Sequence, residues 1–422
     1  MSTSTQSLRN YVVVTSAYWV FTLSDGAFRM LLLLHLHERG YSPLAIASMF
    51  LLYESLGVVT NWVGGSVGSR FGLKRTLGTG LGLQVVTLSA LAGLPSEVWI
   101  LLAAQATSAV AKDLVKMSAK SYVKLVVPDG DYDRLLRWVS VLTGSKNALK
   151  GAGFFLGGVL LVALGFRGAC AVMAVALVAT FGLVLVVLPA SAGMAKTKRT
   201  LAEVAVQDRR ITWLAAARLF LFGARDVWFV LALPIFLRTE LRWTHAEVGG
   251  FLALWVMGYG AVQGLAPWYL GSRRDDAAEM AVIPRTPVVP GAGQLVSWTG
   301  ALAVPIVGLS IWFEQWAVSA AVLGVGLALF GVVFAANSAL HSFLIVRYAS
   351  REHVARHLGV YYSANAAGRL IGTLLSGAVF QAAGAGQAGL GACLWTSSGF
   401  VGLAWLLSIG VLRAEQRGSA RA

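Results

Sequence analysis

The sequence predicts an all-α membrane protein, a 12-helix fold in which two six-helix bundles surround a central cavity. Three observations predict it. First, 57% of the 422 residues are hydrophobic and only 13% are charged, whereas soluble domains carry roughly 25% charged residues. Second, apolar runs of the length that spans a bilayer, about 20 residues, recur along the whole chain. Third, basic residues gather on alternate connections. An ordinary soluble enzyme, a disordered chain and a disulfide scaffold are therefore excluded.

Hydrophobic runs separated by Gly, Pro or charge clusters predict the individual helices. The first six are expected at residues 10–36, 42–66, 76–94, 97–124, 135–163 and 167–189, and the second six at 211–238, 244–270, 290–310, 315–346, 357–383 and 388–412. We expect residues 1–189 to form an N-terminal six-helix bundle, 190–210 a basic cytoplasmic linker, and 211–422 a C-terminal six-helix bundle with a short cytoplasmic tail. Two blocks of six favour a duplicated architecture, although no residue-level repeat is apparent.

The basic residues outside the spans predict the orientation. With the N-terminus inside, 22 Lys and Arg lie on inner segments, Lys120 among them, and four lie on outer segments. Cytoplasmic loops carry such an excess of positive charge. We therefore expect a multi-pass protein of the bacterial inner membrane with both termini cytoplasmic, and we attribute the net charge of +15 to topology rather than to nucleic-acid binding.

Twelve charged residues remain inside predicted spans. Eight are basic: Arg29, Lys112, Lys116, Lys146, Lys150, Arg218, Arg225 and Arg369. Four are acidic: Asp25, Glu54, Asp113 and Asp226. Each costs on the order of 2.5–3.5 kcal/mol at the bilayer centre, so it needs a wet cavity or a partner. The alternative for a single residue is snorkelling from a helix end, or a purely structural ion pair.

The spacing of these residues places them on shared helix faces. Pairs four residues apart are Asp25 and Arg29, Lys112 and Lys116, Lys146 and Lys150, and Asn365 and Arg369, while Arg218 and Arg225 are seven apart. Two lysines at this spacing repel each other, and an anionic ligand relieves the repulsion. Arginine grips phosphate or carboxylate with two hydrogen bonds, and lysine supplies a point charge. The pattern predicts a small polyanionic substrate.

Other polar residues within the spans allow two interpretations each. Asn337 and His341, four apart on the tenth helix, could donate to substrate or form a helix–helix hydrogen bond. Asp25, Asp113 and Asp226 each neighbour a basic residue. They could hold that cation in place, which we favour, or couple transport to protons.

The sequence contains no nucleophile elbow, phosphate-binding loop or metal-ligand cluster, and its two cysteines, Cys170 and Cys393, lie far apart. We therefore expect neither an enzyme nor a metal site, and no cofactor. A non-transporting receptor or membrane-embedded enzyme is the least favoured class.

The segment between the second and third helices reads GSVGSRFGLKR (Gly65–Arg75). It resembles the cytoplasmic loop motif G-x-x-x-D-R-x-G-R-[KR] of the major facilitator superfamily. The matching residues are Gly65, Arg70, Gly72 and Lys74, and Ser69 replaces the usual Asp. The resemblance implies the 12-helix fold and a gating role for this loop. On the fifth helix, GFFLGG (Gly153–Gly158) resembles the antiporter motif of the superfamily, but its small residues mainly allow close helix packing.

Six longer blocks resemble the ArsJ family of organoarsenical efflux permeases within that superfamily. They are residues 9–43, 111–128, 142–158, 217–230, 249–260 and 361–377. The resemblance implies export of 1-arseno-3-phosphoglycerate, functional pairing with the glyceraldehyde-3-phosphate dehydrogenase that makes it, and arsenate resistance in a bacterium. We expect a monomer. A phosphate, sugar-phosphate or other organic-anion transporter of the same fold stays open as the alternative.

The superfamily fold also implies which helices line the cavity: the first, fourth, seventh and tenth, with the second, fifth, eighth and eleventh beside them. We therefore divide the basic residues into two clusters. The N-terminal cluster is Arg29, Lys112, Lys116, Lys146 and Lys150, and the C-terminal cluster is Arg218, Arg225 and Arg369. A substrate with phosphate and arsenate at opposite ends suits two separated clusters.

Overall fold

The computed structural model of the chain describes residues 3–40, 55–63, 72–95, 97–189, 208–271, 289–317 and 319–419. These residues are almost entirely helical and contain no strand. The N-terminal half comprises α1 (Thr3–Glu38), a helix over residues 55–63, α3 (Leu73–Gly93), α4 (Val98–Val126) and α5 (Tyr132–Val187). The predicted linker falls almost wholly outside the described residues.

Helix α5 contains the fifth and sixth predicted spans. Gly165 interrupts it with φ 66° and ψ 176°, a left-handed conformation that glycine adopts without a steric penalty. The break falls between the predicted spans 135–163 and 167–189, in agreement with the sequence prediction of two spans here.

The C-terminal half comprises α7 (Arg209–Phe229), α8 (Ala232–Thr239), α9 (His245–Gly264), α10 (Ala266–Leu270), α11 (Ala292–Gln315), α12 (Ala320–Tyr348), α13 (Val354–Ala382) and α14 (Gly386–Ser419). Here the predicted spans at 211–238 and 244–270 each contain a break that the sequence analysis did not predict. The first breaks at Val230, four residues before Pro234, whose ring opposes the carbonyl at that position. The Ser376 hydroxyl accepts hydrogen bonds from the freed amides of Leu231 and Ala232. The second breaks at Leu265, before Pro267.

The chain is a multi-pass membrane protein. In the part of the chain that the structure describes, eight helices are long and apolar enough to cross a membrane. One of them is α5, whose 56 residues suffice for two crossings at about 20 residues each. Large apolar side chains such as Val162 and Val186 are 91% and 85% exposed, as expected for a surface that faces lipid.

Each half packs two of its helices through glycines. In the N-terminal half, a Cβ at Gly153 of α5 would lie 2.6 Å from the Leu23 carbonyl oxygen of α1. In the C-terminal half, a Cβ at Gly372 of α13 would lie 2.7 Å from the Gly223 carbonyl oxygen of α7. Small residues let helix backbones approach closely in membranes. The equivalent pairs, first with fifth and seventh with eleventh span, agree with a duplicated architecture.

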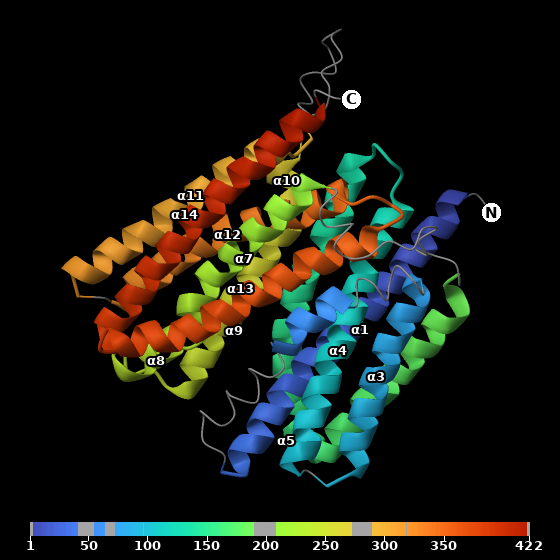
Figure 1. The fold of residues 1–422 in the computed structure, drawn as a ribbon. Helices are drawn as coiled ribbons and strands as arrows, with labels where there is room; N and C mark the ends of the chain where they lie inside the picture. Colours follow the sequence, from blue (N-terminus) through green and yellow to red (C-terminus); the bar gives the residue numbers. More distant parts are fainter. Residues whose placement is uncertain are drawn as a thin grey trace.

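The two bundles meet at the end of the molecule that carries both chain termini, which we call the terminal side, and they diverge toward the opposite end, which we call the open side (Figure 1). On the terminal side, α5 and α9 are in contact, since a Cβ at Gly144 would clash with the backbone of Gly264. The Ser363 hydroxyl of α13 donates to the Val58 carbonyl at 2.9 Å. The halves are therefore closed against each other on the terminal side.

Candidate functional site: a cationic cavity between the halves

A cavity of about 210 Å³ lies between the two bundles and is lined by α1, α4, α5, α7, α9, α12 and α13. Its charged lining residues are Asp25, Arg29, Lys112, Lys116, Lys120, Lys146, Lys150, Arg218, Arg225, Asp226 and Arg369. Nine of these are basic and two are acidic. Carboxylates at the cavity wall thus leave most of the positive charge uncompensated.

On the N-terminal side of the cavity, α4 presents lysines at every fourth position. The Lys116 ammonium binds Asp113 Oδ1 at 2.6 Å, and the Thr60 hydroxyl donates to Asp113 Oδ2 at 2.6 Å. Asp113 is buried behind the lysine rather than in the cavity wall. On α1, Arg29 Nε lies 3.8 Å from Asp25 Oδ2. Each of these two carboxylates thus contacts a basic side chain of its own helix.

Two more lysines reach the cavity from α5. Lys150 lies 5.7 Å from the centre of the Phe154 ring. Lys146 has no hydrogen bond or ion pair within the described residues, although it is only partly exposed. Beside it, Asn147 donates to Gln263 of α9 at 2.7 Å. Lys146 therefore stands among cations with no carboxylate of its own.

On the C-terminal side, one carboxylate organises two arginines. Asp226 is fully buried on α7. Arg225 approaches its Oδ1 at 2.5 Å, and Arg369 of α13 donates to its Oδ2 at 3.1 Å. The rings of Phe222, 4.9 Å away, and Phe334, 5.6 Å away, flank the Arg225 guanidinium. Ring faces attract guanidinium groups, so this arginine is held on two sides.

Arg218 is held by neutral partners. Its guanidinium donates to Asn365 Oδ1 at 2.9 Å and to Ser338 Oγ at 3.0 Å, and lies 3.8 Å from the Phe222 ring centre. The Tyr259 hydroxyl donates to the same Ser338 at 2.9 Å. None of these contacts neutralises the arginine, so its charge contributes fully to the cavity.

The structure brings all eight basic residues of the two predicted clusters to this cavity, together with Asp25, Asp226 and Asn365. It places Asn337 and His341 elsewhere. Asn337 donates to Thr299 of α11 at 2.8 Å, which is the helix–helix hydrogen bond that the sequence left open. His341 is fully buried, with its ring 6.4 Å from that of Tyr361.

The structure changes the assignment of one basic residue. Lys120, which the sequence assigned to an inner segment, is 4% exposed and lines the cavity. Its position four residues after Lys116 is the signal that identifies it.

Of the predicted gating loop, Gly65 and Arg70 lie outside the described residues, as does Glu54. Gly72 precedes α3 with φ 87°, and Lys74 donates to the Leu185 carbonyl at 2.6 Å.

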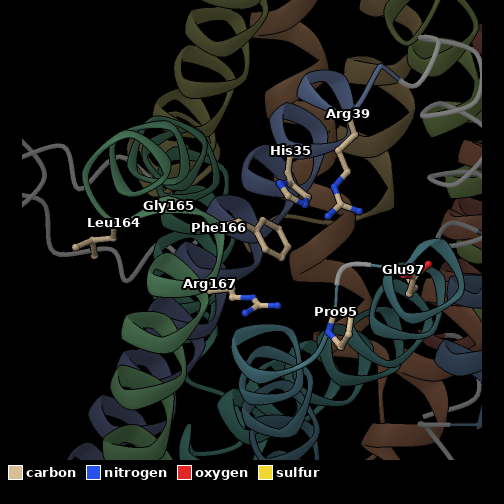
Figure 2. Close-up of a pocket in the computed structure, with 8 residues that line it drawn as sticks. All are labelled: His35, Arg39, Pro95, Glu97, Leu164, Gly165, Phe166 and Arg167. Carbon is tan, nitrogen blue, oxygen red and sulfur yellow. The ribbon is translucent and has the colours of Figure 1, made fainter.

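A second pocket of about 450 Å³ lies at the open side of the N-terminal half (Figure 2). Its wall includes His35 of α1, Arg39 directly after α1, and Arg167 of α5, opposite Glu97. The His35 ring stacks on the Phe166 ring, with the ring centres 4.1 Å apart. One half alone forms this pocket, so it cannot be the site that both halves share.

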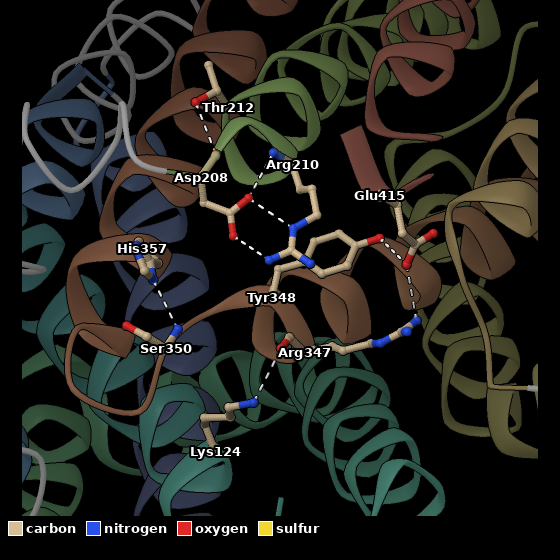
Figure 3. Close-up of polar contacts among 9 residues, drawn as sticks. All are labelled: Lys124, Asp208, Arg210, Thr212, Arg347, Tyr348, Ser350, His357 and Glu415. Carbon is tan, nitrogen blue, oxygen red and sulfur yellow. Dashed lines mark hydrogen bonds and ion pairs between the residues drawn. The ribbon is translucent and has the colours of Figure 1, made fainter. Parts of the chain in front are cut away.

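A polar network closes the terminal side (Figure 3). Lys124 of α4 donates to the Arg347 carbonyl at 3.3 Å, joining the two halves. Within the C-terminal half, Arg347 and the Tyr348 hydroxyl both bind Glu415, at 3.4 and 2.9 Å. Beyond the network, Arg351 pairs with Asp129 at 2.9 Å. The cavity is thus separated from the terminal side by charged contacts that a rotation of the halves would break.

Comparisons with known proteins agree with this architecture. The family model described as Major Facilitator Superfamily matches residues 14–313. No curated relative matches the chain. Among solved structures of similar fold is the human organic anion transporter TETRAN, with 16% sequence identity and a TM-score of 0.70 over 94% of this chain and 99% of that chain. A bacterial homologue of the iron transporter ferroportin in an outward-facing state has 16% identity and a TM-score of 0.74, over 98% of this chain and 100% of that chain. The proton:xylose symporter XylE has 14% identity and a TM-score of 0.69, over 96% of this chain and 95% of that chain.

Proposed function

The chain belongs to the major facilitator superfamily, and we propose that this transporter exports a small anion with two charged ends, 1-arseno-3-phosphoglycerate, and so confers arsenate resistance. The observation that carries the proposal is the cavity itself, where nine basic and two acidic side chains from both halves face one space.

The excess of positive charge supports an anionic substrate. Holding several cations close together is unfavourable without a counter-charge, because like charges at neighbouring positions on a helix repel. Lys146 has no counter-charge among the described residues, and Arg218 has only neutral partners. An anion in the cavity would supply the missing charge. A hydrophobic cation, such as a drug, would be repelled from the same cavity.

The division of the cations between the halves supports a substrate with two anionic ends. Lysines of α4 and α5 belong to one half, and the arginines of α7 and α13 to the other. A two-ended anion can bind both clusters at once and favour closure of the halves around it. A ligand drives such a change only through contacts that differ between the two states.

The resemblance to organoarsenical permeases supports the choice of substrate. All nine basic residues that line the cavity fall within five of the six sequence blocks that carry the resemblance. The terminal side would then be cytoplasmic, and the structure would have its cavity open toward the side of release. Oxygen-rich pentavalent arsenic also suits a site of Lys and Arg better than thiol-seeking trivalent arsenic does.

Expression in bacteria lacking their own arsenate resistance tests the proposal. Cells carry the permease alone, the dehydrogenase alone, or both, and are grown on arsenate or arsenite. We expect protection from arsenate only with both proteins, and no protection from arsenite. Protection by the permease in cells without dehydrogenase activity would instead identify free arsenate as substrate. No protection in any strain would favour the alternative, a phosphate, sugar-phosphate or other organic-anion transporter, since the same cations suit those anions.

A further inference from the structure

Lys120 and Tyr362 form a contact between the two halves at the terminal-side end of the cavity. The Lys120 ammonium lies 4.8 Å from the centre of the Tyr362 ring, and the Lys116 ammonium lies 4.9 Å from the same ring. The lysines belong to α4 and the tyrosine to α13. One aromatic ring of the C-terminal half therefore covers two cations of the N-terminal half.

Lys120 depends on this ring more than Lys116 does. Lys116 has the Asp113 carboxylate at 2.6 Å. Lys120 has no ion pair among the described residues; its one hydrogen bond goes to the Thr143 hydroxyl at 3.4 Å, and its side chain is 4% exposed. A buried ammonium needs compensation, and here the ring face supplies it.

Lys112, Lys116 and Lys120 form a ladder along α4. At about 1.5 Å per residue, eight residues span about 12 Å of the helix axis, and Lys120 is the step nearest the terminal side. Four residues further, Lys124 already takes part in the closure of that side. Lys120 is thus the first cavity cation that an anion would meet if the halves parted there.

Parting of the halves on the terminal side would withdraw Tyr362 from α4. The Tyr361 ring lies 5.0 Å from the Tyr362 ring, and the hydroxyls of both tyrosines are buried and have no hydrogen-bond partner among the described residues. Buried polar groups are normally satisfied. Separation would expose these hydroxyls, and Lys120 with them, to the terminal side.

We propose that Lys120 captures an anionic end of the substrate from the terminal side, and that the Tyr362 ring replaces that anion when the halves close. This inference rests on the proposed function. When the halves are closed on the terminal side, the ring face contacts the ammonium groups of two lysines. This contact lowers the affinity of the N-terminal cluster for the substrate and favours release of the substrate on the open side. Lys120 and Tyr362 thereby make the affinity of the site different on the two sides of the membrane.

Transport measured separately from each face tests this assignment. Everted vesicles present the terminal side to the medium if it is cytoplasmic, and right-side-out vesicles present the open side. The probe is radiolabelled 3-phosphoglycerate, a stable anion with two charged ends, followed by counterflow. For Lys120→Gln we expect the KM from the terminal side to rise about tenfold, with the KM from the open side unchanged. Lys120→Arg should restore the terminal-side KM, and Arg134→Gln, which changes an exposed basic residue outside the cavity, serves as the control.

The tyrosine variants test the other half of the inference. Tyr362→Leu removes the ring face, so the KM from the open side should fall three- to tenfold as both lysines become available, and outward release should slow. Tyr362→Phe keeps the ring and should behave as wild type. Equal changes at both faces for Lys120→Gln, or an unchanged open-side KM for Tyr362→Leu, would overturn this inference alone. Absence of wild-type counterflow in both orientations would overturn this inference, whereas the proposed function is decided by transport of the arsenylated product itself.

Discussion

The carboxylate of Asp226 on α7 accepts a hydrogen bond of 3.1 Å from the guanidinium of Arg369 on α13, 143 residues away in the sequence. Its other oxygen binds the adjacent Arg225 at 2.5 Å, and the carboxylate is fully buried. A single acidic residue therefore binds two of the three arginines of the C-terminal cluster.

Asp226→Asn should destabilise the protein and abolish transport. The substitution leaves two arginines without their counter-charge, and removal of one partner from a buried pair costs about 3–5 kcal/mol. We expect thermal unfolding in detergent to occur several degrees lower than in wild type. Asp25→Asn is the matched control, because its ion pair with Arg29 is longer, at 3.8 Å. Equal unfolding temperatures for the two variants would contradict the organising role of Asp226.

Arg225→Lys should keep the positive charge and lose substrate affinity. Lysine has no planar fork and cannot reproduce two parallel hydrogen bonds to one oxyanion, nor the guanidinium contact with Phe222 and Phe334. We expect KM to rise about tenfold, equivalent to about 1.4 kcal/mol. Lys150→Arg, which also exchanges one cation for the other, should change KM less. Wild-type affinity in Arg225→Lys would show that this arginine acts only as bulk charge.

Lys146 and Lys116 should separate substrate binding from stability. Lys146→Gln removes a cation that has no ion pair among the described residues, so the unfolding temperature should stay the same or rise while anion transport is lost. Lys116→Gln instead leaves the buried Asp113 without its 2.6 Å partner, and should lower the unfolding temperature. Thermal unfolding and vesicle transport, measured on the same preparations, check both. Destabilisation by Lys146→Gln would identify it as a structural residue.

Arg351→Ala should favour opening of the terminal side. Arg351 bridges the halves through Asp129 at 2.9 Å and the Val127 carbonyl at 2.6 Å. Exposed ion pairs contribute about 0–1 kcal/mol, so we expect a two- to fivefold increase in labelling of a cysteine introduced near the terminal-side contact, in a protein lacking Cys170 and Cys393. Arg134→Ala breaks a similar pair, with Asp131, inside one half, and should leave the labelling unchanged.

The sequence predicted most of the fold because bilayer-length apolar runs are a local property. The breaks at Val230 and Leu265 were not predicted, although Pro234 and Pro267 mark them. The apolar run continues through each break, and other helices can form hydrogen bonds with the backbone groups that the break leaves unpaired. At the first break, the Ser376 hydroxyl, about 145 residues further along the chain, accepts hydrogen bonds from two of these amides.

The cavity cations were also predictable, since a charge inside a span is costly wherever it lies. Their partners were not. The pairing of Asp226 with Arg369 and the cover of Lys120 by Tyr362 join residues more than 140 positions apart, and only the packing of the helices brings them together. Lys120 itself was misassigned because its place near the end of a span made it look like a cytoplasmic charge.

Uptake of the arsenylated product into everted vesicles tests the central claim most directly. Dehydrogenase, triose phosphate, nicotinamide cofactor and arsenate in the medium make the substrate in place, and trapped arsenic and phosphorus are counted by mass spectrometry. We predict that wild-type vesicles accumulate arsenic only with the complete mixture, and that Lys146→Gln vesicles accumulate none. Equal accumulation without triose phosphate, or in Lys146→Gln, would contradict the account of a cationic cavity that carries a two-ended organoarsenical.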